Sequence, residues 1–278
     1  MAISRPDFEY ITDLVRIKAG IVLEAGKEYL VESRLLPLVR KEGFAALSEL
    51  VAALRSRSVN GLHYQVVEAM TTNETTFFRD FKPFELLRTK VLPEMVSRRV
   101  ADKSISVWCA ASSSGQEPYS IAMLLREHFG FLGTWRVDLI ASDISREMLA
   151  RTRQGRYSQL EVNRGLPASY LVKYFRKEGT EWQVRDDLRQ MLSLREINLA
   201  EPWPLLPPLD IIFMRNVLIY FSVDSKKEIL ARVRKSLKPD GYLFLGGAET
   251  TLNLDDSFEA VPGVSTCYRL KGAMAQLN

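Results

Sequence analysis

The stretch that decides the fold is VWCAASSSGQEPYSI, Val107 to Ile121. Apolar residues come first, a run of small residues from Ala110 to Gly115 follows, and Pro118 stands where the first turn of a helix is expected. The pattern predicts a buried strand that passes into a helix through a loop that lets a ligand approach the backbone. The stretch has neither GxGxxG nor a Walker lysine, so it does not predict a dinucleotide or phosphate site.

Glu117 lies at the expected positive end of that helix. A carboxylate there suits a ligand that carries a cation, and S-adenosylmethionine has an ammonium group in its methionyl portion and binds at this edge of an open α/β sheet. The alternative is that Glu117 only complements the helix dipole. The stretch alone leaves both interpretations open.

Two neighbouring segments favour a ligand site. VDLIASD ends in Asp143, whose carboxylate is placed either to hold a ribose diol or to cap the helix that follows from Ser145. LDIIFMRN ends in Arg215 and Asn216 after a near-continuous apolar run. Polar groups are costly to bury without partners, so these ends indicate an edge of the sheet that faces a ligand.

The rest of the chain predicts two domains. Helices are expected from Ser4 to Gly20 and over 29–42, 47–56 and 62–70, which make an all-α domain over residues 1–72. Residues 73–82 read as a linker, and a catalytic domain follows over 83–278. It is expected to open with a helix over 83–99 and to contain a parallel sheet, with strands near Ile105, Val137, Leu194, Ile211, Leu243 and Cys267. An insertion at about 153–192 predicts a helix and a strand-turn-strand.

Composition narrows the class of protein. The formal net charge is +4, opposite charges are interleaved, and no basic tail argues for nucleic acid. No apolar run reaches the roughly 18 residues of a membrane span, and the N-terminus is not a signal peptide, so we expect a cytoplasmic protein.

Cys109 and Cys267 are expected to be buried and reduced. His63 and His128 are too few for a metal site, so no metal is expected.

Five motifs together resemble the CheR-type chemotaxis protein glutamate methyltransferases, in the same order and spacing. They are NETTFFRD at 73–80, WCAASSSGQEPYS at 108–120, ASDIS at 141–145, INL at 197–199 and RNVLIYF at 215–221. The resemblance covers nearly the whole chain. It implies a Rossmann-like methyltransferase domain with an inserted antiparallel β-subdomain behind the all-α domain.

The resemblance also implies an activity. Such an enzyme transfers the methyl group of S-adenosyl-L-methionine to glutamate carboxylates on the cytoplasmic methylation helices of chemoreceptors, and releases S-adenosyl-L-homocysteine. It is a cytoplasmic monomer that is recruited to membrane receptor arrays without inserting into the membrane. A nucleic-acid methyltransferase and a binding module without catalysis are the rival functions. A nucleic-acid methyltransferase should show a basic groove, and the sequence gives no sign of one. A binding module without catalysis would have lost Arg79, Asp143 or Glu117, and all three are present.

Site residues follow from the same resemblance. Glu117 would hold the methionyl amine, Asp143 the ribose, Asn198 and Leu199 the adenine, and Arg215 the methionyl carboxylate. Asn73 and Thr75 would close over the cofactor, and Asn216 would support Arg215. Arg79 and Tyr220 are the catalytic candidates. Arg79 would orient the substrate carboxylate by a forked hydrogen bond and also border the cofactor.

Two surfaces are candidates for receptor contact. Lys27, Arg34 and Lys41 recur every seven positions and share one helix face, which is either an ordinary solvated face or, by resemblance, the receptor-binding face. Some family members bind a pentapeptide tether at the receptor's C-terminus through the β-subdomain, usually with a longer glycine-rich turn there. This chain has the short turn KEGTEW, Lys177 to Trp182, so we expect that the tether is not used.

Overall fold

The computed structural model describes residues 3–272, which form two compact units. The first unit contains residues 3–72 with two later segments, 198–202 and 220–226. The second contains residues 73–197, 203–219 and 227–272. None of the helices over residues 3–272 combines the length and the apolar character that crossing a membrane requires.

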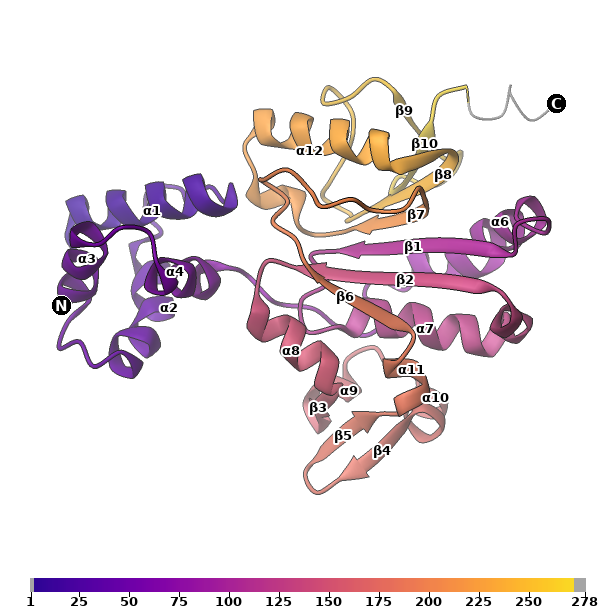
Figure 1. The fold of residues 1–278 in the computed structure, drawn as a ribbon, viewed down its shortest axis with the longest axis horizontal. Coiled ribbons are helices and arrows are strands. Elements are labelled where there is room, and N and C mark those ends of the chain that lie inside the picture. Colours follow the sequence, from indigo (N-terminus) through magenta and orange to yellow (C-terminus); the bar gives the residue numbers. More distant parts are fainter. Residues whose placement is uncertain (1–2, 273–278) are drawn as a thin grey trace. The chain divides into compact units, whose positions relative to one another are not determined.

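The first unit is built on four helices, as the sequence predicts (Figure 1). They are α1 (Arg5–Ala19), α2 (Glu28–Lys41), α3 (Leu47–Ser56) and α4 (Gly61–Met70). Ser4 caps α1 by accepting a hydrogen bond from the backbone N–H of Asp7, and Gly20 ends it in the left-handed conformation with φ of 69°. The all-α N-terminal domain is therefore confirmed.

The later segments of this unit pack against the end of α1. Ile21 forms an isolated antiparallel bridge with Phe221. A Cβ added to Gly20 would lie 2.8 Å from the ring of Phe221 and 3.0 Å from Ala200. Gly20 thus allows both the helix end and this close packing, a connection that local sequence patterns do not reveal.

The second unit contains a seven-stranded sheet in the order β6-β2-β1-β7-β8-β10-β9 (Figure 1). Its strands are β1 (Ser104–Ala110), β2 (Arg136–Asp143), β6 (Leu192–Glu196), β7 (Leu209–Met214), β8 (Leu237–Leu245), β9 (Phe258–Ala260) and β10 (Cys267–Leu270). The first five in that spatial order are parallel, and β10 pairs antiparallel with β8 and β9. The predicted strands are all present, and β9 was not predicted.

The remaining helical segments lie in the second unit, except that η3 (Leu218–Tyr220) ends and α12 (Val223–Ser236) begins in the segment 220–226 of the first. They are α5 (Lys82–Leu86), the π-helical η1 (Leu87–Val91), α6 (Leu92–Arg98), α7 (Gln116–His128), η2 (Gly130–Thr134), α8 (Arg146–Gln154), α9 (Gln159–Asn163), α10 (Ala168–Tyr174), α11 (Asp186–Arg189) and η3 (Leu218–Tyr220). The single helix expected over 83–99 is therefore three consecutive segments. Pro93 lies at the start of α6 and has no N–H to continue an α-helical ladder, which accounts for the widened turn before it.

A small antiparallel sheet, as expected of this fold class, follows α8. It contains β3 (Arg156–Ser158), β4 (Phe175–Glu178) and β5 (Glu181–Val184) in the order β3-β5-β4. The strand-turn-strand was predicted, but β3 was not. Its three residues are too few to show a periodicity, and they become a strand only by pairing with β5.

The two faces of β1 bury different partners. Ile105, Val107 and Cys109 join the large core that contains the apolar residues of α7, whereas Trp108 stacks edge-on against Trp203 at 4.9 Å. Both faces of β1 are buried, which explains the uninterrupted apolar run from Val107 to Ala110. Cys109 and Cys267 are both buried free thiols, as predicted, and burial raises the pKa of Cys267 to about 12.

Candidate active site

The loop between β1 and α7 is held in a strained conformation. Ala111 and Ser113 have φ of 53° and 51°, and Gly115 has φ of 94° just before the helix. A Cβ at Gly115 would lie 2.6 Å from the methyl carbon of Thr152, so only glycine fits. Tyr157 of β3 donates to the carbonyl of Ser114 at 2.6 Å and supports the loop from the small sheet. Strain of this kind is maintained at functional sites by surrounding structure.

Glu117 and Arg215 meet inside this edge of the sheet. Arg215 Nη1 lies 3.1 Å from a carboxylate oxygen of Glu117, and both residues are buried. Arg215 Nη2 also donates to Asp80 at 2.7 Å and to the carbonyl of Arg79 at 3.0 Å. Burial raises the pKa of the Glu117 carboxyl above its ordinary value, and the nearby positive charges of Arg215 and Arg79 oppose that rise. Arg215 at the end of β7 thus has protein partners, and the predicted ligand-facing edge stays a prediction.

Arg79 belongs to a turn with unusual backbone angles. Phe78, Asp80 and Phe81 have φ of 47°, 66° and 47°, although none is glycine. Arg79 Nη1 donates to the carbonyl of Glu74 at 3.0 Å, within the same segment. Phe77 is fully buried and packs edge-on against aromatic rings of the small sheet. Residues 73–80 are therefore anchored in the second unit, although their polar sequence reads as a linker.

The Asp143 carboxylate accepts hydrogen bonds from backbone N–H groups at the same edge of the sheet. It accepts from the N–H of Ser113 at 2.8 Å and from the N–H of Ser145 at 2.9 Å. Ser113 Oγ donates to the carbonyl of Asn73 at 2.7 Å, which brings the NETTFFRD segment to the β1–α7 loop. The N-cap of α8 is Ser145, whose hydroxyl accepts from the N–H of Met148 at 3.1 Å, so the interpretation of Asp143 as the helix cap is wrong. The role of Asp143 toward a ribose stays a prediction.

Five buried side-chain polar atoms have no hydrogen-bond partner among the described residues. Three of them follow the carboxyl ends of β1 and β7, namely Ser112 Oγ, Arg215 Nε and Asn216 Oδ1, and the other two are Gln65 Oε1 and Arg189 Nε. Buried polar atoms normally have partners, and an exception calls for an explanation such as a ligand. The donors and acceptors here, with the carboxylates of Glu117 and Asp143, fit a ligand with amino, carboxyl and hydroxyl groups. The methionyl and ribose portions of S-adenosylmethionine carry these groups.

Other predicted site residues lie in the first unit. Asn198 Nδ2 donates to the carbonyl of Lys18 at 2.6 Å, and its Oδ1 accepts from the N–H of Ala200 at 3.0 Å. Leu199 is buried, and Tyr220 is half-buried with its carbonyl accepting from the N–H of Val22. The structure therefore does not bring these three residues together with Glu117 within one unit.

The predicted receptor-binding face is only partly free. Arg34 donates to the carbonyl of Met70 at 2.6 Å and to the hydroxyl of Thr72 at 2.8 Å, so its guanidinium ties α2 to the end of α4. Lys27 precedes α2 as its N-cap residue, and Lys41 is exposed at its last position. Seven-residue spacing indicates a shared face but does not show whether a side chain already has partners.

Two acidic residues were missed. Asp80 and Glu249 were not predicted as site residues, yet both contact the segment that follows β7. Glu249 lies in LFLGGAET, where an apolar strand ends in small residues and a carboxylate, as VDLIASD ends in Asp143. That repeated pattern was the available signal.

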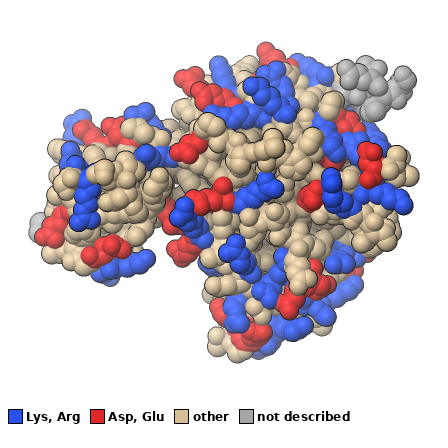
Figure 2. All heavy atoms as spheres, in the orientation of Figure 1, with Lys and Arg blue, Asp and Glu red and all other residues tan. Residues whose placement is uncertain are grey.

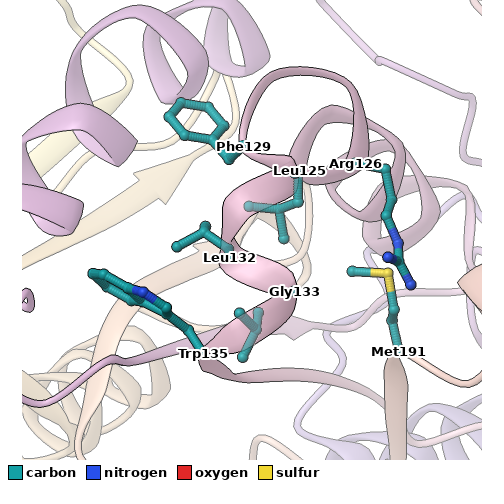
Figure 3. Close-up of a pocket in the computed structure, with 9 residues that line it drawn as sticks. Leu125, Arg126, Phe129, Leu132, Gly133, Trp135 and Met191 are labelled. Carbon is teal, nitrogen blue, oxygen red and sulfur yellow. The ribbon is translucent and has the colours of Figure 1, made fainter.

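The hollow in Figure 3 lies at the other end of the sheet. Leu125, Phe129, Leu132 and Trp135 contribute to its lining, as do Arg126 and Met191, whose side chains point toward one another. They come from the end of α7, from η2 and from the region before β2 and β6, so the hollow is remote from the carboxyl ends of the strands. Ligands of open α/β sheets bind at those carboxyl ends, so this hollow is not the candidate site.

Comparisons with known proteins agree with this geometry. The family model described as "CheR methyltransferase, SAM binding domain" matches residues 73–267, and the one described as "CheR methyltransferase, all-alpha domain" matches residues 6–71. The fold and these matches define the chain as an S-adenosylmethionine-dependent methyltransferase.

Similarity to curated proteins extends over nearly the whole chain. Chemotaxis protein methyltransferase Cher2 of Pseudomonas putida is 42% identical over 271 residues, which cover 95% of this chain and 98% of that protein. Chemotaxis protein methyltransferase 1 of Pseudomonas aeruginosa is 41% identical over 279 residues, covering 98% and 100%. The chain belongs to the CheR methyltransferase family, which confirms the resemblance seen in its motifs.

Proposed function

We propose that this enzyme transfers the methyl group of S-adenosylmethionine to glutamate side chains of bacterial chemoreceptors. The observation that carries the proposal is the buried Glu117–Arg215 pair at the carboxyl edge of the sheet, with Arg79 close enough to influence the pKa of Glu117. Glu117 and Arg215 can hold a zwitterionic methionyl group, and Arg79 then remains as a cation beside the reacting carboxylate. The names of the relatives supply the chemotaxis context.

When bound, S-adenosylmethionine supplies an electrophilic methyl group on a sulfonium. Glu117 would hold the ammonium and Arg215 the carboxylate of the methionyl portion, with Asn216 beside it and Asp143 on the ribose hydroxyls. Asn73 and Thr75 would border the cofactor. Asn198, Leu199 and Tyr220 keep the adenine-binding and catalytic roles that the family resemblance implies.

The chain needs no general base for this reaction, because a glutamate carboxylate has an ordinary pKa far below neutral pH and is already ionised. Arg79 would orient the attacking oxygen through its planar guanidinium. Positioning of this kind can supply roughly 7–11 kcal/mol of the barrier reduction. The proposed receptor contact uses Lys27 and Lys41, and recruitment to receptor arrays follows from the substrate.

Labelled S-adenosylmethionine and a receptor cytoplasmic fragment test the proposal directly. We expect label on the receptor that alkali releases, because carboxyl methyl esters are base-labile. Label that survives alkali, or label on nucleic acid offered in parallel, would contradict it.

A receptor fragment without its last five residues tests tether use. The turn between β4 and β5 contains only Gly179 and Thr180, so we expect equal methylation of full-length and truncated fragments. A large loss on truncation would show that the small sheet binds the receptor C-terminus.

A further inference from the structure

The Glu249 carboxylate lies in a cluster of backbone amides beside the proposed cofactor site. One oxygen accepts from the N–H of Asn216 at 2.8 Å and from that of Gly246 at 2.6 Å. The other accepts from the N–H of Val217 at 2.8 Å and from that of Ile219 at 3.3 Å. Glu249 is 8% exposed. A buried carboxylate with four backbone donors holds those four amides in one arrangement.

These amides belong to the segment that positions Arg215. Three of them follow β7 directly, and the fourth follows the end of β8, the neighbouring strand. Asn216 has φ of 57°, a left-handed conformation that places its N–H toward Glu249. Glu249 thus joins the carboxyl ends of two strands at the edge where Glu117 and Arg215 meet.

Close packing leaves little freedom at this junction. A Cβ at Gly246 would lie 2.7 Å from Glu249 Oε2 and 2.8 Å from Asn216 Nδ2. Glu249 is also near enough to raise the pKa of Glu117 by its negative charge. The carboxylate is therefore part of the electrostatic surroundings of the candidate site, although its own oxygens face backbone donors.

We propose that Glu249 is a positioning residue for cofactor binding, because its carboxylate fixes the turn that carries Arg215 and Asn216. This inference rests on the proposed role of Arg215 toward the methionyl carboxylate. Glu249 does not itself contact the cofactor. Its effect should therefore be on affinity, through the shape of the turn, and much less on the methyl transfer step.

Glu249→Gln is the sharpest test. The amide keeps the size of the side chain, but in either orientation its NH2 group faces two backbone N–H donors. We expect the affinity for S-adenosylhomocysteine to fall at least about tenfold, equivalent to ~1.4 kcal/mol. The KM for S-adenosylmethionine should rise in proportion, with kcat at saturation changing much less.

Asp210→Asn is the matched control for lost stability. Asp210 is also a fully buried carboxylate that accepts a backbone N–H, from Ser106 at 2.8 Å, and it pairs with Arg99 and Lys238. It lies near the amino end of β7, remote from Arg215. We expect this variant to lower the melting temperature while leaving cofactor affinity nearly unchanged. If both variants lose stability and neither loses affinity, Glu249 is only structural and the proposal is overturned.

Hydrogen exchange of the unmutated protein tests the same geometry without any substitution. The amides of Asn216, Val217, Ile219 and Gly246 should be protected in the ligand-free protein, and unprotected exchange at these positions would overturn the proposal even if Glu249→Gln does not fold. Failure of the unmutated protein to bind S-adenosylhomocysteine would instead contradict the proposed function. Affinity lost only in Glu249→Gln supports the positioning role.

Discussion

Gly115→Ala perturbs the junction where β1 passes into α7. At φ of 94° an alanine adopts a backbone conformation that costs roughly 1–3 kcal/mol, because its Cβ is crowded there. The new Cβ would also lie 2.6 Å and 2.8 Å from the side-chain atoms of Thr152. Overpacking of a close-packed interior adds about 1–3 kcal/mol. We therefore expect the free energy of unfolding to fall by about 2–6 kcal/mol.

Thr152→Ala separates the two contributions. The threonine hydroxyl donates toward the carbonyls of Ser113, at 3.1 Å, and Met148, at 2.9 Å. Losing these hydrogen bonds costs about 1–3 kcal/mol by itself. In the Thr152→Ala background, Gly115→Ala should cost mainly the backbone strain, since the 2.6 Å and 2.8 Å contacts are gone.

Chemical denaturation of the unmutated protein, both single variants and the double variant measures this coupling. We expect the double variant to be more stable than the sum of the single losses predicts, by about 1–3 kcal/mol, the overpacking contribution. Additivity within about 0.5 kcal/mol would refute the reasoning, because residues in direct contact should couple. Titration with S-adenosylhomocysteine on the folded variants should show weaker binding for Gly115→Ala than for Thr152→Ala.

Three further variants test the candidate site and surface. Burial raises the pKa of Glu117 above its ordinary 4.5, so S-adenosylhomocysteine affinity should fall as pH falls through the raised pKa, and Glu117→Gln should bind weakly at every pH. The stability of the ligand-free protein should change in the opposite direction, because the folded protein holds the Glu117 proton more tightly than the unfolded chain does. Its free energy of unfolding should therefore fall as pH rises from about 4.5 through the raised pKa. The free energy of unfolding of Glu117→Gln should lack this pH dependence. Arg79→Lys should keep cofactor affinity but lose at least about tenfold in single-turnover methylation, and a proportional loss of both would make Arg79 a cofactor ligand. Reversing Lys27 and Lys41 to Glu should slow receptor methylation and reduce its salt dependence with cofactor affinity unchanged, whereas normal methylation would leave them as solvated surface. Arg34 is excluded from this last variant because it ties α2 to α4.

Local patterns in the sequence were sufficient for the main elements. The apolar run before Ala110, the glycine at 115 and the proline at 118 predicted the strand, the turn and the helix, and all three are present. Ser4 and Gly20 likewise bracket the first helix as predicted. Caps, periodicity and turn residues act over a few positions, so they can be read from the chain alone.

The order of the motifs fixed the family and the expected cofactor, but long-range pairing decided the site. Glu249 contacts Asn216 across 33 positions, and Arg215 contacts Asp80 across 135. No local pattern specifies such partners, because they meet only when strands far apart in sequence end at the same edge of the sheet. For the same reason the sequence did not predict β3, which forms by pairing with β5, or the hydrogen bonds of Arg34 to the end of α4. Sequence determined which residue types were available, and tertiary structure determined which of them are already paired.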